Sequence, residues 1–281
     1  MKPSLKRLFR ERMCECLEKF EELCEIRVRS NKNLVVYTFG GRYVTDYIAT
    51  QEDIDYILKI ATSRSLYAVE ESIKCGYISC DGGIRIGLSG EAVLDNGKLR
   101  SIKNINSLVI RIAKSVQNLP MEVLPIINNF DNTLILSPPF LGKTTLLREM
   151  TRRLSDKGND ILVIDERNEI SATVDGKQNL DLGANTDVMV GVPKIACYEG
   201  AVRTMAPDII VTDEIFGERE VDCLVDSVRS GVKVMATAHA CNIDKFLLNK
   251  SYAPLKEIMA NYLLLGDSVG AFKEVSYNCS V

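Results

Sequence analysis

The chain has 281 residues, of which 46% are hydrophobic and 26% charged, and this composition is typical of a soluble globular protein with one large domain or two ordinary ones. Thirty-five Lys and Arg against 38 Asp and Glu give a net charge of −3, so the chain lacks the basic balance expected of a nucleic-acid-binding protein. The longest apolar runs, at residues 133–136 and 209–211, fall far short of the ~20 residues that cross a bilayer. The basic first residues lead into charged sequence rather than a signal-peptide core. We therefore expect a cytoplasmic protein without a nucleic-acid partner.

The nine cysteines are spread along the chain without the tight framework of a disulfide-rich secreted fold. No Cys-x-x-Cys pair occurs and His239 is the only histidine, so the sequence does not favour a structural zinc site. Reduced and mostly buried thiols are the expectation.

Residues 1–118 are predicted to form an α+β domain. Apolar residues recur near the helical period between Leu5 and Phe20, and from Glu25 the pattern changes to short strands. Thr50 followed by Asp53 signals the start of a helix. A second helix is predicted at residues 66–75, and turns at residues 40–41, 81–83 and 96–97 separate the strands.

Residues 119–281 are predicted to form a second domain, because the segment 115–125 carries two prolines and little periodicity. Beyond it, apolar strands alternate with helices, which indicates a parallel sheet covered on both faces. The expected strands are residues 133–136, 161–164, 209–212 and 232–237, and the expected helices are residues 144–154, 196–205 and 220–230.

The strongest functional signal is a loop that directly follows one strand and directly precedes a helix. Such a loop binds phosphates through backbone N–H groups and the helix N-terminus, with a lysine on the β/γ-phosphates and a hydroxyl on Mg²⁺. Lys143 and Thr144 fit the last two roles. The expected phosphate-binding residues are Ser137, Pro138, Pro139, Phe140, Leu141, Gly142, Lys143, Thr144 and Thr145.

This loop departs from the usual pattern in three ways. Ser137 stands where a glycine is usual, Phe140 occupies another common glycine position, and two prolines remove two N–H groups. Nucleotide affinity that is weakened or lost is therefore an open alternative.

Two apolar strands end in Asp-Glu, at residues 161–166 and 209–214. Since ligands of open α/β sheets bind at the carboxyl ends of strands, these carboxylates are expected to converge on the phosphates. Asp213 would hold Mg²⁺ through water, and Glu214 would orient or deprotonate the attacking water, with Glu166 as a second candidate. The alternative is solvated charge at a strand end.

The only histidine, His239, ends a third strand at the same edge. Its position there makes it a candidate sensor of the γ-phosphate, and the alternative is a structural histidine.

Several longer strings resemble the sporulation stage III protein AA family, at residues 65–70, 83–90, 102–112, 165–170, 183–188, 203–208 and 236–239. That family is similar to the traffic ATPases of type II and type IV secretion systems. The resemblance implies a RecA-like P-loop NTPase core with a parallel sheet, preceded by a smaller α+β N-terminal domain. It further implies a homo-oligomer, usually a hexamer, with ATP and Mg²⁺ as cofactors.

The resemblance also assigns roles to residues. Residues 165–166 match the acidic box, residues 213–214 the Walker B strand end, and His239 the histidine box. Arg85 and Arg111 occupy strings that match arginines approaching the γ-phosphate, and the alternative is a surface or packing role. Gly217 stands where the family has an arginine, a departure that bears on the rate of hydrolysis.

The sequence and the resemblance leave three functions open. The first is a sporulation ATPase that powers or assembles a channel or secretion apparatus between mother cell and forespore, at the inner face of the mother-cell membrane, with membrane-embedded partners. The second is an assembly scaffold of the same complex without significant ATPase activity. The third, a RecA-like motor on nucleic acid, is disfavoured by the charge.

The basic run at residues 98–114 is expected to be a solvated face, with phosphates, a partner or a membrane surface as alternatives.

Overall fold

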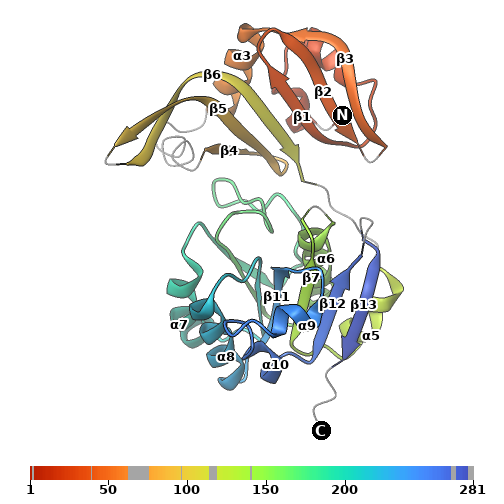
Figure 1. The fold of residues 1–281 in the computed structure, drawn as a ribbon, viewed down its shortest axis with the longest axis vertical. Coiled ribbons are helices and arrows are strands. Elements are labelled where there is room, and N and C mark those ends of the chain that lie inside the picture. The colour runs from red at the N-terminus through yellow and green to blue at the C-terminus, as the bar shows by residue number, and fades with distance from the viewer. Residues whose placement is uncertain are drawn as a thin grey trace. The chain divides into compact units, whose positions relative to one another are not determined.

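The computed structural model describes residues 1, 3–38, 40–62, 76–95, 97–113, 119–139, 141–266 and 270–277. The chain divides into two compact units, drawn in Figure 1: residues 1–114 together with 172–179, and residues 115–171 together with 180–281. The helix predicted at residues 66–75 lies outside the described residues.

The first unit is built on an antiparallel sheet with the strand order β3-β2-β1-β6-β5-β4. Its strands are β1 (Leu23–Arg29), β2 (Lys32–Thr38), β3 (Gly41–Ala49), β4 (Tyr77–Cys80), β5 (Ile84–Asp95) and β6 (Lys98–Ile112).

Three helices of the first unit are described: α1 (Pro3–Lys6), α2 (Glu11–Leu17) and α3 (Gln51–Thr62). The single helical pattern predicted at the N-terminus is two helices, because Arg10 has an extended backbone that redirects the chain, so that α1 and α2 both pack on one core. The predicted start of α3 is confirmed: the Asp53 N–H donates to Thr50 Oγ1 at 3.2 Å and the Thr50 N–H to Asp53 Oδ2 at 2.9 Å, a reciprocal cap.

The second unit is built on a sheet with the order β13-β12-β7-β11-β10-β8-β9, in which all pairings are parallel except that of β13. Its strands are β7 (Thr133–Ser137), β8 (Ile161–Asp165), β9 (Thr186–Val190), β10 (Ile209–Thr212), β11 (Lys233–His239), β12 (Asn261–Leu265) and β13 (Phe272–Tyr277). Its helices are η1 (Met121–Val123), α5 (Leu124–Asn128), α6 (Lys143–Asp156), α7 (Lys194–Met205), α8 (Glu218–Arg229), α9 (Ile243–Leu247) and α10 (Leu255–Ile258).

Successive residues of the central strands pack on opposite faces of this sheet. Leu134 and Leu136 belong to a core shared with α7, α8, α9 and α10, whereas Ile135 belongs to a core shared with α5 and α6. Since both faces are apolar, the strands read as unbroken hydrophobic runs. The prediction of a parallel sheet covered on both faces is confirmed. Within the described residues, no helix combines the length and apolar character needed to span a bilayer.

The strand order fixes which residues meet at the carboxyl edge. His239 of β11 pairs with Ser137 of β7, and Thr212 of β10 pairs with Ile164 of β8. The four central strands therefore deliver the β7–α6 loop, His239, Asp213 and Asp165 to consecutive positions along one edge.

Candidate functional site

The loop between β7 and α6 ends in a left-handed glycine. Gly142 caps α6 with φ 93°, a conformation that side-chain-bearing residues rarely adopt, and its carbonyl accepts from the Leu146 N–H at 2.9 Å. Thr144 and Thr145 are half-buried in the first turn of α6. Phe140 lies outside the described residues, whereas the Ser137 hydroxyl donates to the Pro138 carbonyl at 2.7 Å. A left-handed glycine thus begins the helix at the position where the sequence predicts a phosphate-binding loop.

Lys143, the first residue of α6, is buried at the sheet edge with 5% of its surface exposed. Its Nζ donates to Thr237 Oγ1 at 3.3 Å and lies 3.7 Å from Glu214 Oε1. Burial lowers the pKa of Lys143, and the negative charges of Glu214 and then Asp213 oppose that effect. The edge therefore holds a desolvated amine whose cationic form gains from any added anion.

Asp213 directly follows β10 and is 1% exposed, yet neither carboxylate oxygen accepts a hydrogen bond from the described residues. Its nearest cation is Lys194, with Nζ 3.5 Å from Oδ1. Burial raises the pKa of Asp213 to about 6, against the opposing charge of Lys194. A buried carboxylate with unsatisfied oxygens beside the predicted phosphate-binding loop fits a ligand of Mg²⁺, directly or through water.

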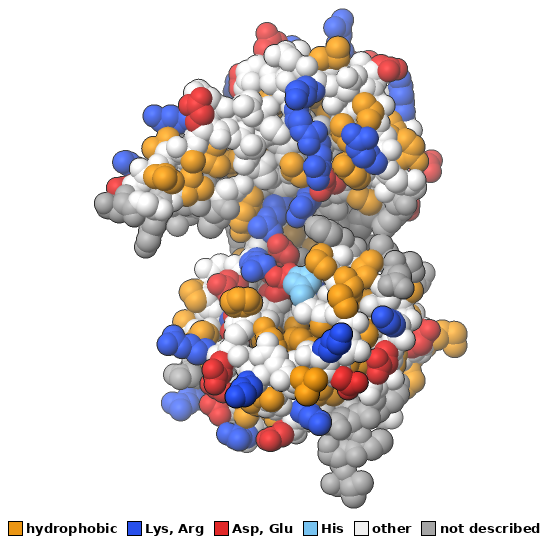
Figure 2. Space-filling view, viewed as in Figure 1, with side chains coloured by type: hydrophobic (Ala, Val, Ile, Leu, Met, Phe, Trp, Pro, Cys, Tyr) orange, Lys and Arg blue, Asp and Glu red, His pale blue; other side chains and the backbone are white. Residues whose placement is uncertain are grey.

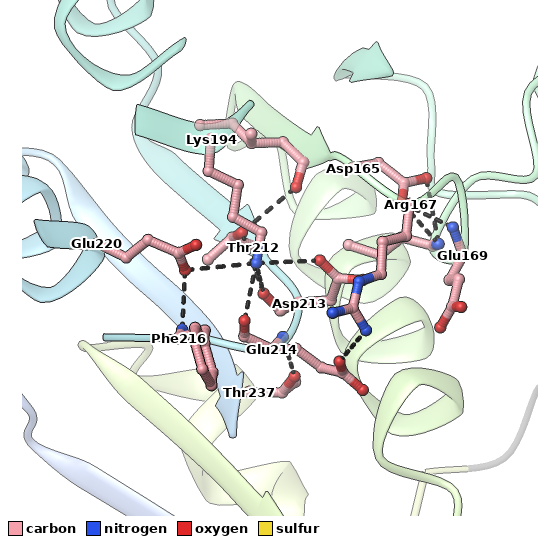
Figure 3. Close-up of polar contacts among 12 residues, drawn as sticks. Asp165, Arg167, Glu169, Lys194, Thr212, Asp213, Glu214, Phe216, Glu220 and Thr237 are labelled. Carbon is pink, nitrogen blue, oxygen red and sulfur yellow. Dashed lines mark hydrogen bonds and ion pairs between the residues drawn. The ribbon is translucent and has the colours of Figure 1, made fainter. Parts of the chain in front are cut away.

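Glu214 is held from several sides in a left-handed backbone conformation, with φ 32°. Its N–H donates to Thr237 Oγ1 at 2.8 Å, its Oε1 lies 2.9 Å from His239 Nε2, and its Oε2 forms an ion pair with Arg167. Burial acts to raise the pKa of Glu214, but the charge of Lys143, the His239 contact and Arg167 outweigh it and lower that pKa. The carboxylate is therefore kept ionised, and Figure 3 shows it directed at Arg167.

Asp165, at the end of β8, is fully buried and serves its own loop. Its oxygens accept from the N–H groups of Glu169, Ile170 and Ser171, and from the Ser171 hydroxyl at 2.7 Å. The neighbouring Glu166 is exposed and makes no hydrogen bond or ion pair within the described part of the chain. Of the acidic pair predicted here, one carboxylate organises residues 166–171 and the other faces solvent.

His239 ends β11 with 46% of its side chain exposed, and appears in Figure 2 as the pale-blue group beside acidic side chains. Its Nδ1 lies 3.3 Å from the Ser137 carbonyl oxygen, and its Nε2 contacts Glu214. The imidazole thus links the base of the β7–α6 loop to the carboxylate after β10.

Arg85 and Arg111 lie opposite each other on β5 and β6 of the first unit. The Arg85 guanidinium stacks on Tyr77 at 3.7 Å from the ring centroid, and Arg111 Nε lies 3.2 Å from Glu25 Oε2. These contacts lie within the first unit, so the approach of either arginine to a phosphate stays a prediction.

Three residues of this edge were missed from the sequence: Arg167, Lys194 and Thr237. Arg167 directly follows the first Asp-Glu pair, and Thr237 lies two residues before His239, so their positions could have suggested the site. Lys194, which contacts the turn after β10, gives no signal in the sequence because it lies 19 residues before Asp213. Together these groups form an edge where a helix N-terminus, an amine, an unsatisfied carboxylate and an ionised carboxylate meet, which suits a metal-bound phosphate ester.

Comparisons with known proteins identify the family of the chain. The model of the family "Sporulation stage III, protein AA" matches residues 3–270. Stage III sporulation protein AA of Bacillus subtilis (strain 168) is 32% identical over 262 residues, which cover 90% of this chain and 85% of that protein. Protein SEEDLING PLASTID DEVELOPMENT 1 of Arabidopsis thaliana is 28% identical over 83% of this chain, which spans 32% of that protein.

Solved structures share the fold. The pilus retraction motor PilT with bound ADP matches 95% of this chain and 81% of its own with a TM-score of 0.62 at 16% identity. The Legionella pneumophila ATPase DotB matches 86% of this chain and 72% of its own with a TM-score of 0.57 at 13% identity. The RecA-like fold predicted from the sequence is thereby confirmed. With the family model covering nearly the whole chain, the protein belongs to the sporulation stage III protein AA family.

Proposed function

We propose that the second unit binds ATP with Mg²⁺ and hydrolyses the terminal phosphate. The observation that carries this proposal is the contact of Lys143, Glu214 and His239 with one another or with Thr237, at the sheet edge where Asp213 follows β10. Lys143 follows β7, Asp213 and Glu214 follow β10, and His239 ends β11, so their convergence is a property of the fold.

The binding roles follow from the positions of the groups. The backbone N–H groups at the start of α6 would hold the phosphates, and Lys143 would place its charge on the β- and γ-phosphates. Thr144 and Asp213 would hold Mg²⁺, which when bound neutralises charge that develops on the phosphate oxygens. When the nucleotide binds, the Lys143 ammonium gives up its contact with Thr237 and contacts the phosphates instead. The negative charge of the phosphates stabilises the protonated form of Lys143.

Glu214 is the residue that we assign to the attacking water. Its carboxylate accepts the proton of that water as the oxygen attacks the γ-phosphorus and the bond to ADP breaks. Arg167 and His239 hold the carboxylate in place before water reaches it, and His239 is positioned to respond to the γ-phosphate. The exposed Glu166 is a weaker candidate for the same role, because no contact within the described chain directs it.

Membership of the family supports a cellular role that goes beyond the chemistry. We propose that the protein acts as a homo-oligomer, a hexamer by its resemblance to traffic ATPases. It would power or assemble a channel or secretion apparatus between mother cell and forespore, through membrane-embedded partners at the cytoplasmic face of the mother-cell membrane. In such an oligomer, Arg85 and Arg111 would approach the γ-phosphate.

The test is phosphate release by the purified chain with Mg-ATP, combined with measurement of nucleotide binding. Lys143→Ala is expected to lose binding and turnover, whereas Glu214→Gln keeps binding and loses turnover by roughly 100-fold or more, since it loses only the water-directing carboxylate. Lys250→Ala and Glu257→Gln are matched controls, because both side chains are exposed and make no hydrogen bond or ion pair within the described chain.

Equal background rates in the wild type, Lys143→Ala and Glu214→Gln would exclude hydrolysis at this edge. If the wild type also showed no binding of Mg-ATP by calorimetry while folded, the assembly scaffold would be the remaining function.

A further inference from the structure

A buried lysine outside the predicted motif lies at the centre of the contacts drawn in Figure 3. Lys194 is the first residue of α7 and is 5% exposed. An ammonium is costly to bury, and at a helix N-terminus it also opposes the positive end of the helix dipole. Its place therefore depends on acceptors that compensate for both effects.

All the acceptors of Lys194 belong to the turn after β10 and the start of α8. Its Nζ donates to the backbone carbonyl of Asp213 and, at 2.9 Å, to that of Glu214. The Asp213 and Glu220 carboxylates each lie 3.5 Å from the same nitrogen. Two hydrogen bonds from one ammonium thus hold two successive carbonyl groups of the turn, and two nearby carboxylates oppose its charge.

That turn contains the left-handed Glu214, a conformation that is unfavourable in a residue with a side chain. Its N–H groups are held by β11 and α8: Glu214 donates to Thr237 Oγ1, and Phe216 donates to Glu220 Oε2 at 3.0 Å. Lys194 holds the opposite side of the turn, through the carbonyl groups. With both sides held, the Glu214 side chain is aimed at His239 and Lys143.

We propose that Lys194 is a positioning residue of the nucleotide site, which fixes the backbone of Asp213 and Glu214 so that the Glu214 carboxylate stays in reach of His239. The inference rests on the proposed hydrolysis for its functional consequence. Lys194 itself touches neither the nucleotide nor the water; it acts through the turn.

The first test separates positioning from binding. Lys194→Met keeps much of the side-chain length and removes the charge and all three donors. We expect kcat for ATP to fall by roughly 100-fold, since a small misplacement of a reacting group costs that much, while KM changes by less than about threefold. Lys157→Met is the matched control, because Lys157 also donates to a backbone carbonyl, that of Ile127 at 2.9 Å, but at the far end of α6.

The second test needs no nucleotide, because the chain contains a single histidine whose ring signals in a ¹H–¹³C spectrum need no further assignment. In Lys194→Met, the His239 signals are expected to move in the same direction as in Glu214→Gln, since both variants remove the held carboxylate from Nε2. Lys157→Met leaves them in place.

The outcomes distinguish the two proposals. Wild-type His239 signals in a folded Lys194→Met would overturn the positioning role, whatever the turnover. A shift of these signals in a protein whose wild type releases no phosphate would support the positioning of Glu214 and refute the proposed hydrolysis. Equal losses in kcat and in nucleotide affinity would also overturn the inference. If Lys194→Met does not fold, Lys194→Gln, which retains two N–H donors, carries both measurements with smaller expected changes.

Discussion

The second unit carries the same dipeptide, Asp-Glu, at the carboxyl ends of two adjacent parallel strands, and the two copies differ in what surrounds them. Asp165 and Asp213 are both buried, and they follow the paired residues Ile164 and Thr212. Asp165 accepts hydrogen bonds from three N–H groups and a hydroxyl of its own loop, whereas Asp213 accepts none from the described residues. A carboxylate that accepts hydrogen bonds from its own loop stabilises that loop, whereas a buried carboxylate that accepts none is available to a ligand.

For the two glutamates the order is reversed, because the one in the second pair makes more contacts. Glu166 is exposed, whereas Glu214 is contacted by His239 and Arg167. Hydrogen bonds and ion pairs, rather than residue type, therefore distinguish the two Asp-Glu pairs. The four predictions below test this difference.

The largest expected effect is on stability, in Asp165→Ala. Truncation leaves several buried N–H groups without an acceptor, and we expect the free energy of unfolding to fall by about 4 kcal/mol in urea denaturation followed by circular dichroism. Asp187→Ala, at an exposed position of β9, is the control and should change it by less than about 0.5 kcal/mol. Equal stability of the two variants would contradict a loop-folding role for Asp165.

Asp213 is expected to make stability depend on pH in the absence of metal and nucleotide. Its pKa is raised by burial from 3.8 to about 6, so the folded state binds the proton more tightly than the unfolded chain does. The free energy of unfolding of the wild type therefore falls as pH rises from 3.8 to about 6. Above that range the contribution of Asp213 to the free energy of unfolding no longer changes with pH. Relative to Asp213→Asn, the wild type should lose on the order of 3 kcal/mol across that range. Parallel profiles of the two proteins in EDTA would show that Asp213 does not titrate in this way.

Arg167→Gln tests the ion pair of Glu214 through the pH dependence of turnover. The lowered pKa of Glu214 reflects burial outweighed by Lys143, His239 and Arg167 in turn. Without Arg167 that pKa rises, and the acid limb of kcat/KM should move to higher pH. The shift is expected to be small, because Arg167 is more than half exposed and its charge is screened by solvent. Superimposable profiles would exclude a contribution from Arg167.

The smallest effect is expected in Glu166→Gln, since its side chain is exposed and makes no hydrogen bond or ion pair within the described chain. Phosphate release should stay within about twofold of the wild type, and the melting temperature should be nearly unchanged. A loss as large as that of Glu214→Gln would mean that the two Asp-Glu pairs have exchanged the roles assigned to them.

The fold of the central strands could be predicted because their apolar runs and intervening helices follow simple periodicities. The strands β9, β12 and β13 were missed. In β13, for example, Lys273 and Glu274 interrupt the apolar pattern, because this strand lies at the edge of the sheet. At the N-terminus, the extended backbone at Arg10 has no marker in the sequence and divides the predicted helix.

The candidate site could be predicted as far as the strand order alone determines it. Parallel strands bring their carboxyl ends to one edge, so the grouping of Lys143, Asp213 and His239 followed from the alternation of strands and helices. The difference between Asp165 and Asp213 could not be predicted, because it depends on how residues 166–171 turn back, with Asn168 in a left-handed conformation. The same holds for Lys194, whose contacts depend on the path of the chain into α7.

Thr237 on β11 gives the site a further property. Its hydroxyl oxygen accepts from the Glu214 N–H and also from Lys143 Nζ, so one atom joins the start of α6 to the turn after β10. A displacement of Lys143 toward an incoming anion would break its hydrogen bond to Thr237 and leave the hydrogen bond from the Glu214 N–H in place. A valine at this position, equal in shape but without the oxygen, would remove both contacts at once.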